Sequence, residues 1–190
     1  MKQIKNIILS ILVCFLILVR SSIIAQVHTV GLLYSQPSKV YEGYSLIYTH
    51  HQGTVFLVNT CGEIVHEWVD KEFIPGNSAK LMPDGSIFIT KGKGDFGNPW
   101  IKSGGGGGKI EHRDWDNNLI WEYTYNDSLK RMHHDFTVLP NGNVIFIAWE
   151  YKSEQEAIEA GRNPDLIMDC KLFPDHLIEV KPEGKTGGKI

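Results

Sequence analysis

Two stretches of similar sequence decide the fold: Leu81-Met82-Pro83-Asp84-Gly85-Ser86-Ile87-Phe88-Ile89 and Leu139-Pro140-Asn141-Gly142-Asn143-Val144-Ile145-Phe146-Ile147. Pro83 aligns with Pro140, so the second copy follows 57 residues after the first. Asp-Gly and Asn-Gly tolerate positive φ at little cost, and tight hairpin turns select them. Each stretch therefore predicts a hairpin whose returning strand is the apolar run after the turn.

A second motif repeats in the same order, because Gly62-Glu63-Ile64-Val65-His66-Glu67-Trp68 resembles Asn117-Asn118-Leu119-Ile120-Trp121-Glu122-Tyr123. Short runs that alternate apolar and polar residues extend from Tyr44 to Val180, which is the signature of strands. Two motifs that recur together indicate one repeated unit, a four-stranded sheet with core aromatics at Trp68, Trp121 and Tyr123. A period in the fifties suits a large β-propeller blade, so the predicted fold class is an all-β propeller.

A third unit is predicted to open at His176-Leu177-Ile178-Glu179-Val180, which parallels Lys109-Ile110-Glu111-His112. It reaches the last four residues, 187–190, where the earlier unit has Gly62-Glu63-Ile64. A chain that stops inside a hairpin would leave an unpaired strand edge. We therefore expect residues 26–190 to be the amino-terminal portion of a propeller, about two and a half blades truncated within a blade.

The first 25 residues have the layout of a signal peptide, with Lys2 and Lys5 before an apolar run from Ile7 to Val19. That run is shorter than the roughly 20 residues of a membrane-spanning helix, so no stable membrane anchor is expected. Cleavage is expected after Ala25, which predicts an exported protein, periplasmic or secreted. Two cysteines then remain, Cys61 and Cys170, and export permits either a disulfide between them or two buried thiols.

Charge excludes one class of partner. Residues 1–25 hold three basic residues and no acidic one, so the formal net charge of −3 becomes −6 after cleavage. A basic surface for nucleic acid is absent, and no nucleic-acid partner is expected. The sequence does not indicate an oligomeric state.

Two insertions interrupt the predicted strands, and both are expected on one face, where loops can build a site. The first insertion, Asp95 to Gly108, is rich in glycine and ends in five consecutive glycines, but Lys109 after them leads into a strand and no Ser or Thr follows it. A phosphate-binding loop is thus excluded, and a surface loop is predicted. Residues 153–160 predict a short helix, with Ser153 and Glu156 as a capping box and Gly161 at its end.

Met132-His133-His134-Asp135-Phe136 is the most informative cluster for chemistry. Neighbouring strand residues point to opposite faces, so His133 and His134 are not expected to bind one metal, and no metal or cofactor is predicted. One histidine could act as nucleophile or acid while Asp135 or a backbone carbonyl fixes its tautomer. The alternative is that one histidine is exposed and the other packs between blades.

The sequence also resembles a known family, the bacterial arylsulfotransferases, which transfer sulfuryl groups between phenolic molecules. The likeness extends over nearly the whole mature chain in the right order. The stretches that carry it are Gly43-Tyr44-Ser45-Leu46 to Val65-His66-Glu67-Trp68, Gly104 to Ile110, His133-His134-Asp135-Phe136 through Leu139-Pro140-Asn141-Gly142-Asn143, and Gly161-Arg162-Asn163-Pro164-Asp165 through Ile178-Glu179-Val180-Lys181-Pro182.

The resemblance implies a six-bladed propeller and an aryl-sulfate sulfotransferase that needs no cofactor or nucleotide sulfate donor. A histidine accepts the sulfuryl group from an aryl sulfate and passes it to a phenol. The implied catalytic residues are His134 and, more weakly, His133. The family's other histidines and its arginine belong to later blades, so the fragment alone is predicted to be inactive. The alternative from a different class is an exported binding or surface propeller without catalysis.

Overall fold

The computed structural model describes residues 32–49, 52–70, 75–92, 101, 104–167, 169 and 171–190. The predicted signal peptide, residues 1–25, lies outside the described residues, as does Cys170. Cys61 is an exposed, free thiol. No helix within the described ranges has the length and apolar content needed to cross a membrane.

The chain forms two compact units, residues 1–40 and 41–190. The described part of the first unit holds a short 3-10 helix, η1 (Pro37–Lys39).

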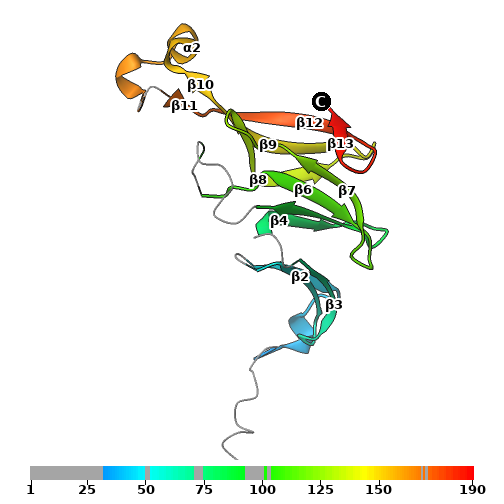
Figure 1. The fold of residues 1–190 in the computed structure, drawn as a ribbon. Helices are drawn as coiled ribbons and strands as arrows, with labels where there is room; N and C mark the ends of the chain where they lie inside the picture. The colour runs from blue at the N-terminus through cyan, green and yellow to red at the C-terminus, as the bar shows by residue number, and fades with distance from the viewer. Residues whose placement is uncertain are drawn as a thin grey trace, which may run out of the picture. The chain divides into compact units, whose positions relative to one another are not determined.

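The second unit is built almost entirely of antiparallel strands, so the all-β prediction is confirmed (Figure 1). The sheets run in the orders β1-β2-β3, β4-β5-β6-β7 and β13-β12-β9-β8, with a small pair β10-β11. In chain order the strands are β1 (Tyr44–Tyr48), β2 (Thr54–Asn59), β3 (Ile64–Val69), β4 (Pro75–Leu81), β5 (Ile87–Lys91), β6 (Lys109–Arg113), β7 (Leu119–Thr124), β8 (Lys130–Val138), β9 (Val144–Glu150), β10 (Lys152–Ser153), β11 (Lys171–Leu172), β12 (Asp175–Glu183) and β13 (Gly187–Lys189).

The repeat in the sequence corresponds to a repeat in the structure. The β4-β5 and β8-β9 turns have the same backbone hydrogen bonds, with Gly85 donating to Met82 and Gly142 donating to Leu139. These two glycines have φ of 85° and 83°, a conformation that side chains with a Cβ rarely adopt. The four-stranded sheets predicted from the repeat, each with an Asp-Gly or Asn-Gly turn, are therefore confirmed.

The division into units near the C-terminus was predicted wrongly. His176 to Val180 does not open a new sheet, because β12 pairs along β9 from Asp175 opposite Trp149 to Val180 opposite Val144. Strands β12 and β13 are instead the third and fourth strands of the sheet that β8 begins. The resemblance to Lys109–His112 reflects the same position within a sheet, the third strand.

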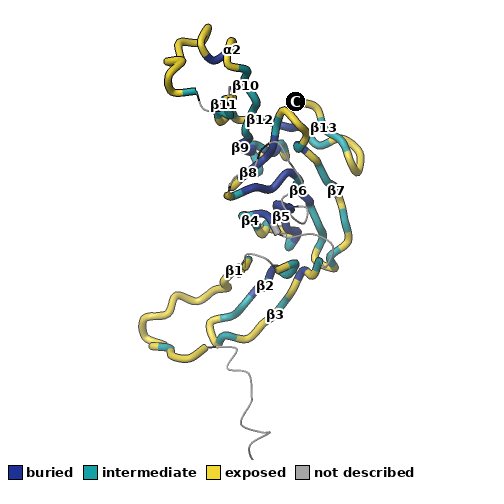
Figure 2. Tube along the Cα trace, turned by 60° about the vertical axis from the view of Figure 1, so that its left-hand side comes forward, coloured by how far each residue is buried: buried dark blue, intermediate teal, exposed yellow. Residues whose placement is uncertain are grey.

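Apolar side chains fill the spaces between successive sheets. Figure 2 shows the buried stretches along the strands of the two four-stranded sheets. Trp121 and Trp68 are 3% and 1% exposed, which confirms both as core aromatics. The core between the four-stranded sheets contains Phe88, Ile110, Trp121, Tyr125, Met132, Phe136, Val144, Phe146, Ala148 and Val180, and the core beside the β1-β2-β3 sheet contains Val55, Leu57, Trp68, Ile87 and Ile89.

The second insertion forms as predicted. Helix α2 (Glu154–Glu159) begins after Ser153, whose side chain accepts a hydrogen bond from the backbone of Glu156 while the Glu156 carboxylate accepts one from the backbone of Ser153. Gly161 follows with φ of 94°. A short 3-10 helix, η2 (Pro164–Leu166), lies between α2 and β11 in the sequence. The capping box and the terminal glycine are confirmed.

Candidate functional site

A bulge in β8 brings His133 and His134 into contact. Pairing with β9 is regular as far as Met132 opposite Ala148 and resumes at Phe136 opposite Phe146. Three residues of β8 therefore lie where the partner strand has one, and His134 adopts φ of 52°. The alternation of faces fails here, so the two rings meet with Nδ1 to Nδ1 at 2.7 Å. The expectation that neighbouring side chains point to opposite faces was wrong at this position.

The two histidines differ in burial. His133 is 4% exposed and stacks on the Trp149 ring of β9 at a centroid distance of 3.8 Å. Its Nε2 lies 3.1 Å from Oδ1 of Asp175, at the start of β12. His134 is exposed, with its ring nearly perpendicular to that of His133. One exposed and one packed histidine is also what the non-catalytic alternative predicted.

Burial and charge favour a neutral His133. Burial is the first cause that lowers its pKa below the ordinary 6.5, and the charges of His134 and Arg131 lower it further, although Asp175 opposes the shift. A carboxylate can only accept a hydrogen bond, so the proton of neutral His133 is on Nε2 and its Nδ1 is an acceptor. The Nδ1 of His134 must then donate. In a neutral His134 ring the lone pair is then on Nε2, the nitrogen that lies beside Gly105.

Asp175 is the hydrogen-bond partner that orients His133, where the sequence predicted Asp135 or a backbone carbonyl. The Asp135 carboxylate accepts a hydrogen bond from the Ser78 hydroxyl at 2.6 Å and lies 3.3 Å from the Lys80 ammonium group, both on β4. It also accepts a hydrogen bond from the backbone N–H of Phe136, and within the described part of the chain it makes no hydrogen bond to either histidine. Asp175 lies 42 residues beyond His133 in the sequence, so only the pairing of β12 with β9 could reveal it.

The glycine run lies along the free edge of β8. His134 donates its backbone N–H to the Gly105 carbonyl at 2.8 Å, and Gly107 donates to the Met132 carbonyl at 3.2 Å. A Cβ on Gly105 would lie 2.2 Å from Nε2 of His134. Because residues 106–108 are buried, the predicted surface loop is wrong for these three glycines, while residues 95–100, 102 and 103 of the insertion lie outside the described residues. Both the glycines and the histidine pair belong to one site.

Arg131 is a member of this site that the sequence did not indicate. Its side chain is 0% exposed, and Nη1 donates to the carbonyl of Ile101 at 2.8 Å. Its Nε and Nη2 atoms are buried and have no hydrogen-bond partner among the described residues. A Cβ on Gly106 would lie 2.3 Å from Nη2, so glycine is required for the guanidinium to fit. Burial lowers the pKa of Arg131, yet the group stays cationic at neutral pH.

The arrangement suits proton transfer or nucleophilic attack by His134. A relay of Asp175, His133 and His134 is held by two hydrogen bonds and by stacking on Trp149. Neutral imidazole with a free Nε2 is a competent base and nucleophile. Within the described ranges, no group of three or more His, Cys, Asp or Glu side chains is placed to hold a metal ion.

Comparison with known proteins adds no further identification. Neither a protein-family model nor a curated protein sequence matches this chain. The fold and the site together define its class as an antiparallel all-β protein with a hydrogen-bonded histidine pair beside a glycine run.

The lowered pKa values of two histidines lead us to expect that acid destabilises the protein. His133 and His112 both have a pKa below 6.5, with burial as the first cause. The unfolded state therefore binds protons at a higher pH than the folded state, and stability falls as the pH drops through 6.5. We expect the free energy of unfolding, measured by urea titration, to fall by about 1 kcal/mol between pH 7.5 and 5.5.

A His133→Phe variant, which can keep the stacking on Trp149, provides the control for this pH effect. Its stability should depend less steeply on pH over the same range. Carboxylates such as Glu111 titrate below this window and do not contribute to it, since their pKa is also lowered. A stability that is constant or increases on acidification would contradict the assignment of a neutral, buried His133.

Proposed function

We propose that this chain is the amino-terminal part of an exported β-propeller enzyme, an aryl-sulfate sulfotransferase. The repeated four-stranded antiparallel sheets with equivalent turns support their interpretation as propeller blades. The resemblance to the arylsulfotransferases supports the activity, six blades in the parent protein, and a phenolic sulfate and a phenol as partners. The observation that carries the proposal is the Nδ1 to Nδ1 hydrogen bond of 2.7 Å, which leaves Nε2 of His134 free.

In this proposal His134 is the base of the second half of the reaction. The sulfur first bonds to a histidine nitrogen of a later blade while its bond to the donor phenolate oxygen breaks. The acceptor phenol then gives its proton to Nε2 of His134 as its oxygen attacks the sulfur and the N–S bond breaks. His133 positions the His134 ring, and the charge of Arg131 helps to keep His133 neutral.

The test uses the product of the reading frame extended past Ile190. We expect release of 4-nitrophenol from 4-nitrophenyl sulfate that depends on added phenol. A His134→Ala variant should lose about 10²-fold to 10⁴-fold of this rate, the usual contribution of a general base. His66→Ala is the matched control, because His66 stacks on Trp115 away from the site and its loss should leave the rate nearly unchanged. The 190-residue chain alone should show no release.

One observation favours the non-catalytic alternative, an exported binding or surface propeller. The guanidinium of Arg131 is completely covered and so cannot contact a substrate as it lies. If a folded, complete protein releases no 4-nitrophenol, or if His134→Ala releases it as fast as the unmodified protein, the enzymatic proposal is wrong and the binding propeller replaces it.

A further inference from the structure

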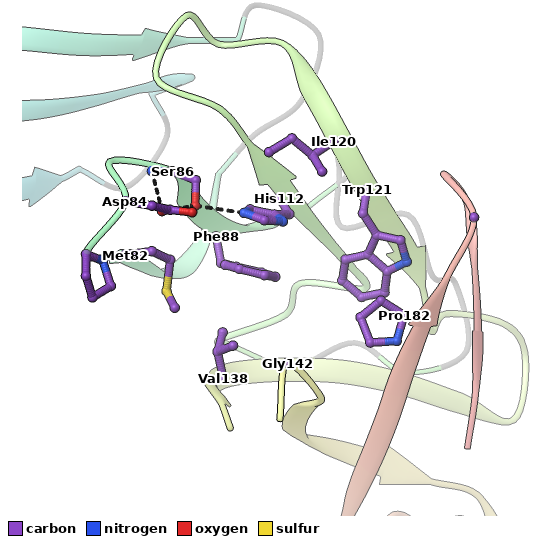
Figure 3. Close-up of a pocket in the computed structure, with 12 residues that line it drawn as sticks. Met82, Asp84, Ser86, Phe88, His112, Ile120, Trp121, Val138, Gly142 and Pro182 are labelled. Atoms are coloured by element: carbon purple, nitrogen blue, oxygen red, sulfur yellow. Dashed lines mark hydrogen bonds between the residues drawn. The ribbon is translucent and has the colours of Figure 1, made fainter. Parts of the chain in front are cut away.

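A cavity of about 530 Å³ lies between the two four-stranded sheets at the end that carries the Asp-Gly and Asn-Gly turns (Figure 3). Its walls are mainly apolar and come from both sheets. The buried rings of Phe88 and Trp121 lie 6.4 Å apart by their centroids and form its floor. The remaining apolar walls are contributed by Met82, Ile120, Val138 and Pro182.

One edge of this cavity is polar, and the donor and the acceptor of each of its hydrogen bonds can be assigned. The Ser86 hydroxyl donates to Oδ1 of Asp84 at 2.7 Å, so its only proton is used. Nε2 of His112, 2.8 Å from the Ser86 oxygen, must therefore be the donor of that contact. Figure 3 shows these three residues in line, with the His112 ring reaching along the cavity wall towards Trp121.

His112 consequently offers a hydrogen-bond acceptor to a ligand. Burial lowers its pKa, which favours the neutral ring, and a neutral ring with its proton on Nε2 has a lone pair on Nδ1. That nitrogen has no hydrogen-bond partner among the described residues. The ring is fixed in place because it stacks on Phe88 at 4.0 Å with an interplanar angle of 10°.

The carboxylate of Asp84 restricts the charge of a ligand that could bind in the cavity. Asp84 is the one carboxylate among the residues that line the cavity, and its pKa is lowered, first by the hydrogen bond from the Ser86 hydroxyl. An anion is therefore disfavoured. Flat aromatic molecules suit a floor of aromatic rings, because offset and edge-to-face contacts add to the burial of apolar area.

We propose that this cavity binds a neutral, flat aromatic compound that donates one N–H or O–H hydrogen bond to Nδ1 of His112. The site is separate from the histidine pair of β8 and does not depend on the proposed sulfotransferase activity. Indole is a suitable probe because it carries one donor and no charge. Its matched control is 1-methylindole, which keeps the ring system and lacks the donor.

The experiment is an NMR titration of the purified protein that follows the methyl groups of Met82 and Ile120. Indole should shift both signals, through the ring current, in a saturable way, and 1-methylindole should bind about five-fold to ten-fold more weakly. In a His112→Phe variant the two ligands should bind equally. His134→Ala should bind indole as the unmodified protein does, which keeps this test independent of the proposed function.

Two results would overturn the proposal. Equal affinities of indole and 1-methylindole for the unmodified protein would show that no hydrogen bond to His112 selects the ligand. Binding of indole that leaves the Met82 and Ile120 methyl signals unchanged would place the ligand elsewhere. Both readouts use the unmodified protein, so they remain decisive even if the His112 variant does not fold.

Discussion

Replacing Glu111 by glutamine is expected to lower the free energy of unfolding by about 3 kcal/mol. Glu111 lies on β6 and is 1% exposed. Its carboxylate accepts a hydrogen bond from Arg113 Nε at 2.8 Å and lies 2.9 Å from the Lys109 ammonium group and 3.9 Å from that of Lys91. A neutral amide of the same shape leaves the buried Lys91 and the partly exposed Lys109 and Arg113 with one negative charge fewer.

The neighbouring cations stabilise the ionised form of Glu111 in its buried position. Burial alone would raise the pKa of Glu111, but the hydrogen bonds from Lys109 and Arg113 hold it below its ordinary value of 4.5. Lys91 is also buried and keeps one other carboxylate, Asp70, at 2.7 Å. Among the described residues the network contains three cations and three carboxylates, so the loss of one carboxylate leaves the cations in excess.

Glu122→Gln is the matched control for this prediction. Glu122 also pairs with Lys109, but its side chain is 25% exposed, so water can replace the lost contact. Its replacement should cost less than about 1 kcal/mol. Urea unfolding of both variants at pH 7 provides the measurement. Equal effects of the two substitutions would show that the buried position of Glu111 contributes nothing special to stability.

Short-range signals made much of the fold predictable. The Asp-Gly and Asn-Gly turns act through the backbone of Gly85 and Gly142, and their φ values are a property of the residue type. Ser153 and Glu156 are only three residues apart, so their capping box can be predicted from spacing alone. Such features depend on neighbours in the chain and need no knowledge of the tertiary structure.

The site was only partly predictable because its geometry departs from strand periodicity. His133 and His134 were identified as candidates, but the alternation of faces that argued against their contact does not hold in a bulge. The partners Asp175 and Arg131 follow from strand pairing and from the fit of the glycine run, which no local motif encodes. A run of five glycines before a strand was the available signal for close backbone approach.

The error in the division into units has a related cause. The apolar alternation of Leu177 to Val180 predicts a strand, and a strand is found there, in β12. Alternation does not specify which sheet a strand joins, and the insertion of β10, α2 and β11 separates β12 from β9 in the sequence. The pairing of β9 with β12 across this insertion is a tertiary property.

Replacing Gly105 by alanine is expected to break the hydrogen bond between the two histidines. Gly105 has φ of 76°, a conformation that costs a residue with a Cβ about 1–2 kcal/mol. The new Cβ would also lie within 2.3 Å of two atoms of the His134 ring. Because that ring is exposed, it can turn away from the added methyl group, and its Nδ1 would then leave Nδ1 of His133.

The matched control is the neighbouring glycine, Gly104, where an added Cβ would meet no atom of the described residues within 4 Å. Imidazole ¹⁵N spectra of the two variants give the measurement. In Gly105→Ala the Nδ1 signals of His133 and His134 should move to the positions of separate rings, whereas Gly104→Ala should match the unmodified protein. If both variants keep the original spectrum, the glycine run does not hold His134 against His133. The free Nε2 of His134, on which the proposed chemistry rests, would then need another source of orientation.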